Sequence, residues 1–385
     1  MEKKKLIIFP GNFLPFIGGL ETHVDEFVKY LSKKNYDVTI FAPNIGGKER
    51  ETIHNEVKVL RYPAHEVVKN FTKPKIFNLK FWKMYFSLYS NKYDLVMTRT
   101  RFFPNSTLGM MFAKFRFKKI PLMHVEHGSE FVKLDSKFKS FVAKVYDKTL
   151  GKMLFKLADT NVAISNDVKK FICKNFVNCR QENVPIIRRG VDFELYDEIS
   201  SDTKFKDKII LGSVCRFYKW KGLENSISAF KNLPSNIKDK CVYLIVGYGE
   251  DEEKLKKLAS GEEGIKFLGK KSFSEAISFM KSFDIFLHSS YPGGGLSNSL
   301  LQAMYCKCAV IASPDEGATD VIDSNTGILL KDNSSKEILS GLIELAEDRN
   351  KRLVLAMNAK KHIEKNFNWN EVIKQYEKEF EILVN

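Results

Sequence analysis

The sequence predicts an α/β protein with two doubly wound domains, each a mostly parallel sheet covered by helices. Short apolar segments alternate with amphipathic segments of helical period through the first half of the chain, and the same alternation starts again near residue 207. A chain of 385 residues is also too long for one ordinary core and suits two domains of about 150 to 200 residues each.

The first domain is predicted over residues 1–190. Its opening strand, helix and strand, expected at 6–10, 21–34 and 37–43, form a βαβ unit, which predicts a parallel sheet with right-handed crossovers. Further strands are expected at 57–62, 94–99, 120–128 and 160–165. Each strand ends in polar or glycine residues, at the edge where open α/β sheets place their ligands.

The second domain is predicted over residues 207–366, after a hinge at 184–197 in which Gly190 supplies the turn. Strands are expected at 208–216, 241–249, 265–269, 284–290 and 308–313, with helices at 223–232, 251–259 and 272–282 between them. Two final helices are expected at 335–362 and 370–383. This count of alternating elements predicts a second doubly wound sheet.

A glycine-rich turn precedes a helix and a buried strand in the segment 289–313. Backbone amides at Gly293, Gly294 and Gly295 can approach a ligand closely, and the positive end of the helix that begins near Ser297 points to the same place. The segment therefore predicts a site for a phosphate or a sugar hydroxyl. The alternative is an ordinary helix start, with Ser297 or Asn298 as its N-cap.

Two cations follow the first strand of the second domain. Arg216 ends that strand, and Lys221 lies just before the next helix. A planar guanidinium and a compact ammonium together suit a diphosphate leaving group, whereas Lys219 is expected to point elsewhere. The alternative is a pair of unrelated surface cations near a loop.

The positive charge of the chain belongs to its first half. Residues 1–200 carry a formal charge of +14 out of a total of +15, and the segment 73–92 mixes lysines with Phe, Trp, Tyr and Leu. Such a segment can lie on an anionic membrane surface, or it can be a helix with an aromatic core face and solvated lysines. No nucleic-acid motif accompanies the charge, so we expect no nucleic-acid partner.

Neither membrane spans nor disulfides are expected. No apolar run is long enough to cross a bilayer, and the apolar start of the chain is too short for a signal peptide, so we expect a cytoplasmic protein. The six cysteines include no C-x-x-C pair, and reduced thiols are the default expectation. Cys306 and Cys308 have no histidine cluster beside them to complete a metal site.

Seven segments, in order, resemble the retaining glycosyltransferases of family four, which have the GT-B fold of two Rossmann-like domains facing a central cleft. The resemblance covers nearly the whole chain. The matching segments are PFIGGLETHV (15–24), MHVEHGSEF (123–131), NVAISNDVKKFI (161–172), IIRRGVD (186–192), LGSVCRFYKWKG (211–222), VGYGEDEEKLKKL (246–258) and FNWNEVIKQYEKEF (367–380). In the hinge segment, Arg189 replaces the asparagine that the family usually has.

The resemblance implies transfer of a sugar from a nucleotide diphosphate to a glycan or lipid-linked acceptor, without a cofactor or an obligatory metal. It implies that Arg216 and Lys221 hold the diphosphate and that the amides around Gly18 and Gly19 meet it. His127 would lie against the donor sugar, with Glu126 or Glu130 orienting it. The helix 370–385 would pack back on the first, acceptor-side domain.

The glycine-rich segment departs from the family pattern. Members usually carry two glutamates there, and aligning LLQAM with the usual LLEAM puts Gly294 and Gln302 at those positions. An amide can still bind ribose hydroxyls, but a glycine offers only its backbone. Gly295, Leu296 and Ser297 would line the donor pocket, and a shifted alignment would bring Asp315 or Glu316 into it.

Two functions remain open from the sequence. The first is an active glycosyltransferase at the inner membrane surface, favoured by the retained glycines, His127, Arg216 and Lys221. The second is a catalytically weakened GT-B protein that binds nucleotide sugar or supports a partner transferase, favoured by the absence of both glutamates. An epimerase or phosphorylase on the same fold has no supporting motif.

Overall fold

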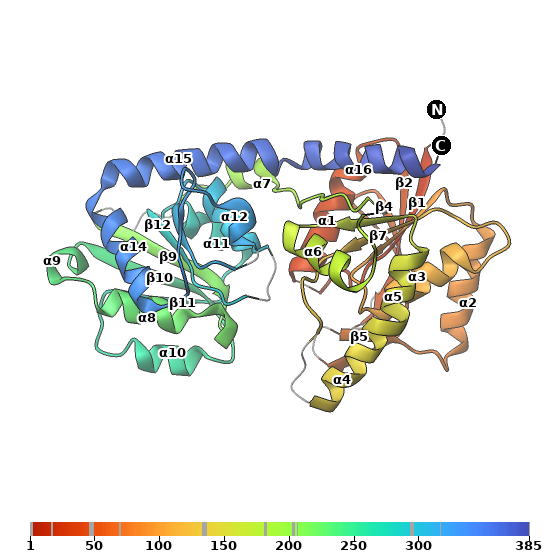
Figure 1. Ribbon diagram of the computed structural model, residues 1–385, viewed down its shortest axis with the longest axis horizontal. Helices are drawn as coiled ribbons and strands as arrows, with labels where there is room; N and C mark the ends of the chain where they lie inside the picture. The colour runs from red at the N-terminus through yellow and green to blue at the C-terminus, as the bar shows by residue number, and fades with distance from the viewer. Residues whose placement is uncertain are drawn as a thin grey trace. The chain divides into compact units, whose positions relative to one another are not determined.

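The computed structural model describes residues 3–16, 18–45, 50–68, 71–132, 137–180, 183–201, 205, 207–292, 296–315 and 317–384. The chain divides into two compact units (Figure 1). Unit 1 consists of Met1–Gly190 and Trp369–Asn385, and unit 2 of Val191–Asn368. Unit 2 therefore begins earlier than the start expected at residue 207.

The sheet of unit 1, as far as it is described, has the strand order β3-β4-β2-β1-β6-β7-β8, with β5 paired to β4. Its strands are β1 (Lys4–Phe9), β2 (Tyr36–Asn44), β3 (Glu51–His54), β4 (Val57–Val68), β5 (Phe71–Pro74), β6 (Leu95–Arg99), β7 (Leu122–Glu126) and β8 (Thr160–Ala163). The central strands are parallel, as predicted. The antiparallel strands β3 and β5 were not expected. β4 extends past the end of β2, and β5 pairs with this extension.

Helices cover both faces of this sheet (Figure 1). They are α1 (Gly19–Ser32), α2 (Leu79–Ser87), α3 (Pro104–Lys114), α4 (Lys137–Tyr146), α5 (Lys152–Leu157), α6 (Asn166–Asn175) and α16 (Trp369–Val384), with short helical turns at Leu88–Ser90 and Asp147–Gly151. α16 packs against α1, and its Trp369, Tyr376 and Phe380 are buried in the same core as Phe27 of α1. The last helix of the chain is therefore part of unit 1.

The described sheet of unit 2 is entirely parallel, with the order β11-β10-β9-β12-β13-β14. Its strands are β9 (Ile209–Arg216), β10 (Cys241–Tyr248), β11 (Ile265–Gly269), β12 (Ile285–His288), β13 (Ala309–Ala312) and β14 (Ile328–Leu329). Its helices are α7 (Phe193–Asp197), η3 (Lys219–Lys221), α8 (Leu223–Lys231), α9 (Ser235–Lys238), α10 (Glu252–Leu258), α11 (Phe273–Met280), α12 (Asn298–Tyr305), α13 (Ala318–Val321), α14 (Ser335–Glu347) and α15 (Arg349–Asn366). Two apolar clusters form its core.

Two expectations are wrong. The single helix expected at 335–362 is two helices, α14 and α15, because Asp348 leaves the helical conformation and its carboxylate caps α15 through the backbone N–H of Lys351 at 2.8 Å. The expectation of reduced thiols fails at Cys173 and Cys179, which form a disulfide. The chain turns after α6 and brings their Cα atoms to 5.3 Å, a proximity that the sequence spacing did not reveal.

Candidate functional site

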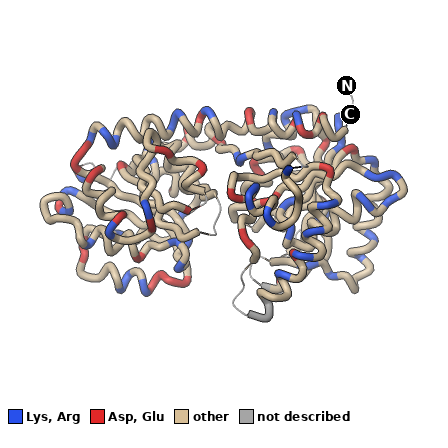
Figure 2. Tube along the Cα trace, viewed as in Figure 1, with Lys and Arg blue, Asp and Glu red and all other residues tan. Residues whose placement is uncertain are grey.

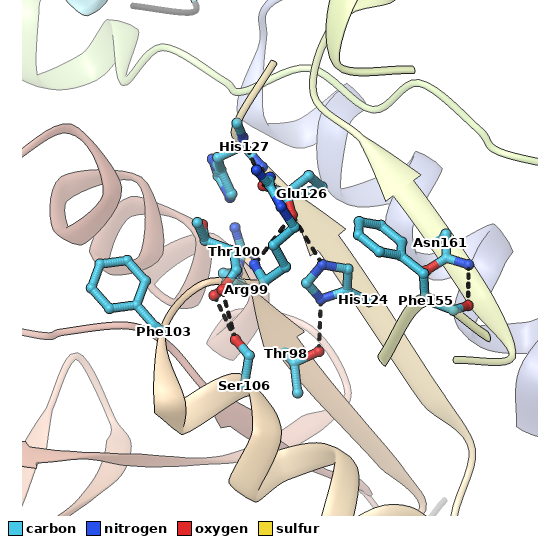
Figure 3. A network of polar contacts seen from close by, with 12 residues as sticks. Thr98, Arg99, Thr100, Phe103, Ser106, His124, Glu126, His127, Phe155 and Asn161 are labelled. Atoms are coloured by element: carbon cyan, nitrogen blue, oxygen red, sulfur yellow. Dashed lines mark hydrogen bonds and ion pairs between the residues drawn. The ribbon is translucent and has the colours of Figure 1, made fainter. Parts of the chain in front are cut away.

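A buried carboxylate organises the carboxyl edge of the sheet in unit 1 (Figure 3). Glu126, the last residue of β7, accepts hydrogen bonds at Oε1 from the backbone N–H groups of His127 and Gly128, at 2.9 and 2.7 Å. Its Oε2 accepts from the backbone N–H of Arg101 at 3.1 Å. Burial alone would raise the pKa of Glu126, but the Arg101 guanidinium, His124 and the N–H donors outweigh it and hold the pKa far below its ordinary value. The ionised carboxylate thus fixes the loop that carries His127.

Arg99, the last residue of β6, and Arg101, two residues later, lie in different surroundings. The guanidinium of Arg101 is buried and contacts both Glu126 and Asp147 at 3.2 Å. The guanidinium of Arg99 lies 4.4 Å from the ring centre of Phe27 and donates to His23. Thr100 between them has a φ of +63°, a left-handed conformation that is rare for a β-branched residue. This left-handed residue interrupts the alternation of side-chain directions that a continuing strand would have.

His127, which is half-buried, lies beside the buried histidine His23. The rings of His23 and His127 have centroids 5.0 Å apart, and Nε2 of each is buried without a partner among the described residues. Because a guanidinium only donates, Arg99 Nη1 donates to Nδ1 of His23 at 3.2 Å, which leaves the proton of His23 on Nε2. Burial, and then the charge of Arg99, lower the pKa of His127 to about 3 and that of His23 well below its ordinary value. Both imidazoles are therefore neutral near pH 7 and suit binding better than acid catalysis.

The first glycine-rich loop leads into α1. Gly18 is the residue before this helix, has extended backbone and provides no side chain to cap it, and Gly19 is the first helical residue. The Gly18 carbonyl accepts from the backbone N–H and the hydroxyl of Thr22, at 3.0 and 2.8 Å. Among the described residues no side chain caps this helix start, and contact of Gly18 and Gly19 with a phosphate stays a prediction.

In unit 2, Lys221 borders a small cavity and Arg216 does not. The cavity lies at the carboxyl ends of β9 and β12 and is lined by Ser213, Val214, Cys215, Lys221, Leu223, Phe286, Leu287, His288, Ser289, Ser290 and Ser299. Lys221 Nζ donates to Ser290 Oγ at 3.4 Å, and burial lowers the pKa of this lysine. The guanidinium of Arg216 lies 5.4 Å from the ring centre of Tyr248, and Lys219 is exposed.

The helix start near the glycine-rich turn is only partly described. Gly294 and Gly295 lie outside the described residues. Leu296 is half-buried, and Ser297 occupies the N-cap position of α12 without capping it, its hydroxyl lying 3.1 Å from that of Ser299. The ordinary-cap alternative therefore does not hold for Ser297, and the first amides of α12 stay without that cap. Nε2 of Gln302 donates to Tyr196 Oη at 3.2 Å.

The structure describes one of the two alternative carboxylates, Asp315. Glu316 lies outside the described residues, and Asp315 is buried against His288. Among the described residues, no group of three or more His, Cys, Asp or Glu side chains could hold a metal ion.

Several polar residues at these strand ends were missed by the sequence analysis. They are His23, Arg99, Arg101, Asp147 and His288. Arg99 ends an apolar strand segment and Arg101 lies two residues beyond it, and charged residues at such a strand end were a signal that could have found them. His23 and Asp147 lie within helical segments, where periodicity indicates only packing.

Two family descriptions match the chain on either side of the hinge. "Glycosyltransferase Family 4" matches residues 17–195, and "Glycosyl transferases group 1" matches residues 196–362. A protein of Methanocaldococcus jannaschii, "Uncharacterized glycosyltransferase MJ1069", is 57% identical over 100% of both chains. The Campylobacter jejuni N,N'-diacetylbacillosaminyl-diphospho-undecaprenol alpha-1,3-N-acetylgalactosaminyltransferase is 26% identical over 66% of this chain and 69% of its own.

Solved structures show the same fold over the full length. Sucrose-phosphate synthase from Thermosynechococcus elongatus has a TM-score of 0.80 at 16% identity, covering 99% of both chains. The Anabaena protein HepE in complex with UDP has a TM-score of 0.74 at 18% identity, covering 99% of this chain and 100% of its own. The two Rossmann-like units therefore form a GT-B fold, and the chain belongs to the group 1 glycosyltransferases.

Proposed function

We propose that the protein transfers a hexose or N-acetylhexosamine from a UDP- or GDP-linked sugar to a lipid-linked or growing glycan, with retention of configuration and without a bound metal. The observation that carries the proposal is Lys221 at a cavity that Ser299 of α12 also lines, because a half-buried cation beside the positive end of a helix suits a diphosphate. The names of the relatives support it, since one acts on a diphospho-undecaprenol acceptor.

In this proposal each unit contributes its own set of groups. In unit 2, Arg216 and Lys221 neutralise the diphosphate as it leaves, while Leu296, Ser297 and Gln302 line the nucleotide. In unit 1, the amides around Gly18 and Gly19 bind phosphate oxygens, and neutral His127 offers a ring nitrogen to a sugar hydroxyl. The buried charge of Glu126 acts only by holding the His127 loop in place.

The experiment is a panel of UDP- and GDP-sugars tested on the purified full chain. We expect one donor to raise the melting temperature of the protein and to be hydrolysed slowly when no acceptor is present. If the reaction retains configuration, NMR should show that an α-linked donor releases an α-configured sugar. Turnover unchanged by EDTA is expected for a metal-independent reaction. If no donor binds, or if every donor binds without turnover under all acceptors tried, the active-enzyme proposal is wrong.

The second candidate is a nucleotide-sugar-binding protein with weakened catalysis. It is favoured by Gln302, which stands at a position where the family usually has a glutamate and whose amide is bonded to Tyr196. The same panel separates the two candidates, because a binding protein shows the thermal shift but no turnover.

We further propose that unit 1 docks on the inner surface of an anionic membrane. In the segment 73–92, Phe81 and Tyr85 of α2 are buried, whereas Phe77 and Leu79 are 99% and 85% exposed. Exposed Lys73, Lys80 and Lys83 accompany these apolar side chains, and Figure 2 shows Lys and Arg spread along unit 1. Apolar anchors among lysines match anionic lipid. In the described residues no helix is long and apolar enough to cross a bilayer.

The docking proposal is tested by sedimentation with phosphatidylglycerol vesicles at low and high salt. We expect the wild-type chain to sediment at low salt and the double variant Phe77→Ser, Leu79→Ser to stay in the supernatant. The matched control is Ile382→Ser, which removes a 65% exposed apolar side chain from α16 and should sediment as the wild type does. Equal sedimentation of the double variant and the wild type would contradict the proposal.

A further inference from the structure

A histidine and an aspartate pair at the carboxyl ends of two neighbouring parallel strands in unit 2. His288 is the last residue of β12, and Asp315 follows β13. His288 Nε2 lies 2.6 Å from Asp315 Oδ2, with the side chains only 5% and 2% exposed. Asp315 Oδ1 also accepts from the backbone N–H of Ala318 at 2.7 Å. The carboxylate is thus held on both oxygens and fixes the orientation of the imidazole.

His288 lines the cavity that Lys221 also borders. Because Asp315 occupies Nε2, Nδ1 is the ring nitrogen that remains for a ligand in this cavity. Among the hydroxyls around the cavity, Ser289 donates to the Lys221 carbonyl, and Ser290 accepts from Lys221 Nζ and keeps its own O–H. The imidazole is therefore a polar group that the proposed donor chemistry has not yet employed.

The charges around His288 suit a protonated ring when an anion is present. An aspartate on one imidazole nitrogen fixes the tautomer and stabilises the imidazolium. A neutral ring with its proton on Nε2 can only accept at Nδ1, which does not suit a phosphate oxygen, whereas the protonated ring donates there. The titratable groups that line the cavity with His288 are Lys221, which opposes protonation, and Cys215, whose pKa burial raises to about 11 so that its thiol stays neutral.

We infer that His288 contacts the donor diphosphate and takes up a proton from solvent when it binds. The new Nδ1–H then donates to a phosphate oxygen, while the Nε2–H remains on Asp315. This inference rests on the nucleotide-sugar function proposed above. It adds a cationic contact for the leaving group to Arg216 and Lys221, in a chain that lacks both glutamates usual in its family.

The test is isothermal titration calorimetry of the full chain with UDP and with GDP, at pH 7 in HEPES and in Tris. Comparing the binding enthalpies in two buffers gives the protons taken up per nucleotide. We expect the wild-type chain to take up as much as one proton more than His288→Gln, whose amide N–H keeps the contact with Asp315. The titration of the nucleotide itself is common to both proteins, so the difference isolates His288. His65→Gln, at an exposed histidine of unit 1, should match the wild type.

The affinities give an independent measure. We expect His288→Gln to weaken UDP or GDP binding about tenfold at pH 6 and much less at pH 8, because the wild-type imidazole is harder to protonate at high pH. Asp315→Asn should lose proton uptake in the same way. This variant replaces His288→Gln in the test if thermal denaturation shows that His288→Gln is not folded. If the His288–Asp315 pair had only a structural role, His288→Gln would weaken binding equally at both pH values and proton uptake would not change. That result would overturn this inference and leave the proposed function standing. Failure of the wild-type chain to bind UDP or GDP would overturn the proposed function and this inference with it.

Discussion

The carboxylate of Glu126 binds the residue that follows it, His127, through the backbone N–H at 2.9 Å. Orientation of the candidate sugar-binding histidine therefore comes from a fixed loop, and the same carboxylate compensates the buried guanidinium of Arg101. One side chain thus combines a structural task with the placement of a functional residue.

Glu126→Gln should lower the free energy of unfolding by about 3 kcal/mol, because it leaves Arg101 buried with a weakened partner. Urea denaturation measures the change. The matched control is Glu56→Gln, at an exposed glutamate of the same unit, for which we expect a change within about 0.5 kcal/mol. Equal losses in the two variants would contradict the role of Glu126.

Stability should fall as the pH drops below about 6.5, the ordinary value for histidine. The pKa of His127 is lowered to about 3 and that of His23 is also lowered, so the unfolded chain takes up protons in this range and the folded chain does not. Between pH 6.5 and 5, we expect the melting temperature of His127→Gln to fall less than that of the wild type.

The matched control for this pH profile is His65→Gln, which should follow the wild-type curve because His65 is exposed. Asp147 acts with the opposite sign, since burial raises its pKa to about 6, but it is common to all three proteins. Parallel curves for the wild type and His127→Gln would show that His127 titrates normally in the folded chain.

Arg216→Ala should weaken UDP or GDP binding about 10-fold to 100-fold, as expected for the loss of a charged hydrogen bond to phosphate. Lys219→Ala, which removes an exposed cation three residues away, should change affinity little. Calorimetry measures both dissociation constants. If the two variants bind alike, Arg216 does not hold the diphosphate.

Gln302→Glu should tighten nucleotide binding about fivefold, because a charged acceptor replaces a neutral one at the ribose. Its stability should stay within about 0.5 kcal/mol of the wild type, since the Tyr196 hydroxyl can donate to the new carboxylate. Weaker binding would show instead that the amide donor of Gln302 is needed.

Thiol titration of the denatured chain should give four reactive cysteines without reductant and six after reduction. The four are Cys215, Cys241, Cys306 and Cys308. Without reductant, Cys173→Ser should add at most one reactive thiol, because it frees only Cys179. Six reactive thiols without reductant would contradict the disulfide.

The alternation of apolar and amphipathic segments was sufficient to predict both sheets, because buried parallel strands and amphipathic helices have distinct periods. It did not reveal the antiparallel strands β3 and β5, which pair with the two ends of β4 and depend on the partner more than on their own sequence. The break at Asp348 was missed because a capping aspartate also fits a continuous helical pattern.

Sequence motifs predicted some residues of the candidate site, whereas contacts between residues far apart in the sequence could not be predicted. Roles for Arg216, Lys221 and His127 were predicted from their motifs and stay predictions, and of the two cations only Lys221 lines the described cavity. The contacts of Glu126 with Arg101 and of His288 with Asp315 join residues 25 and 27 positions apart at the ends of separate strands, and no local pattern encodes such pairs.

The return of α16 to the core of unit 1 affects how the chain folds during synthesis. All residues of unit 2 leave the ribosome before Trp369, Tyr376 and Phe380, which complete the core around Phe27. Unit 2 has its entire sequence available for folding while unit 1 still lacks its last helix. The core of unit 1 therefore stays incomplete until α16 has been synthesised.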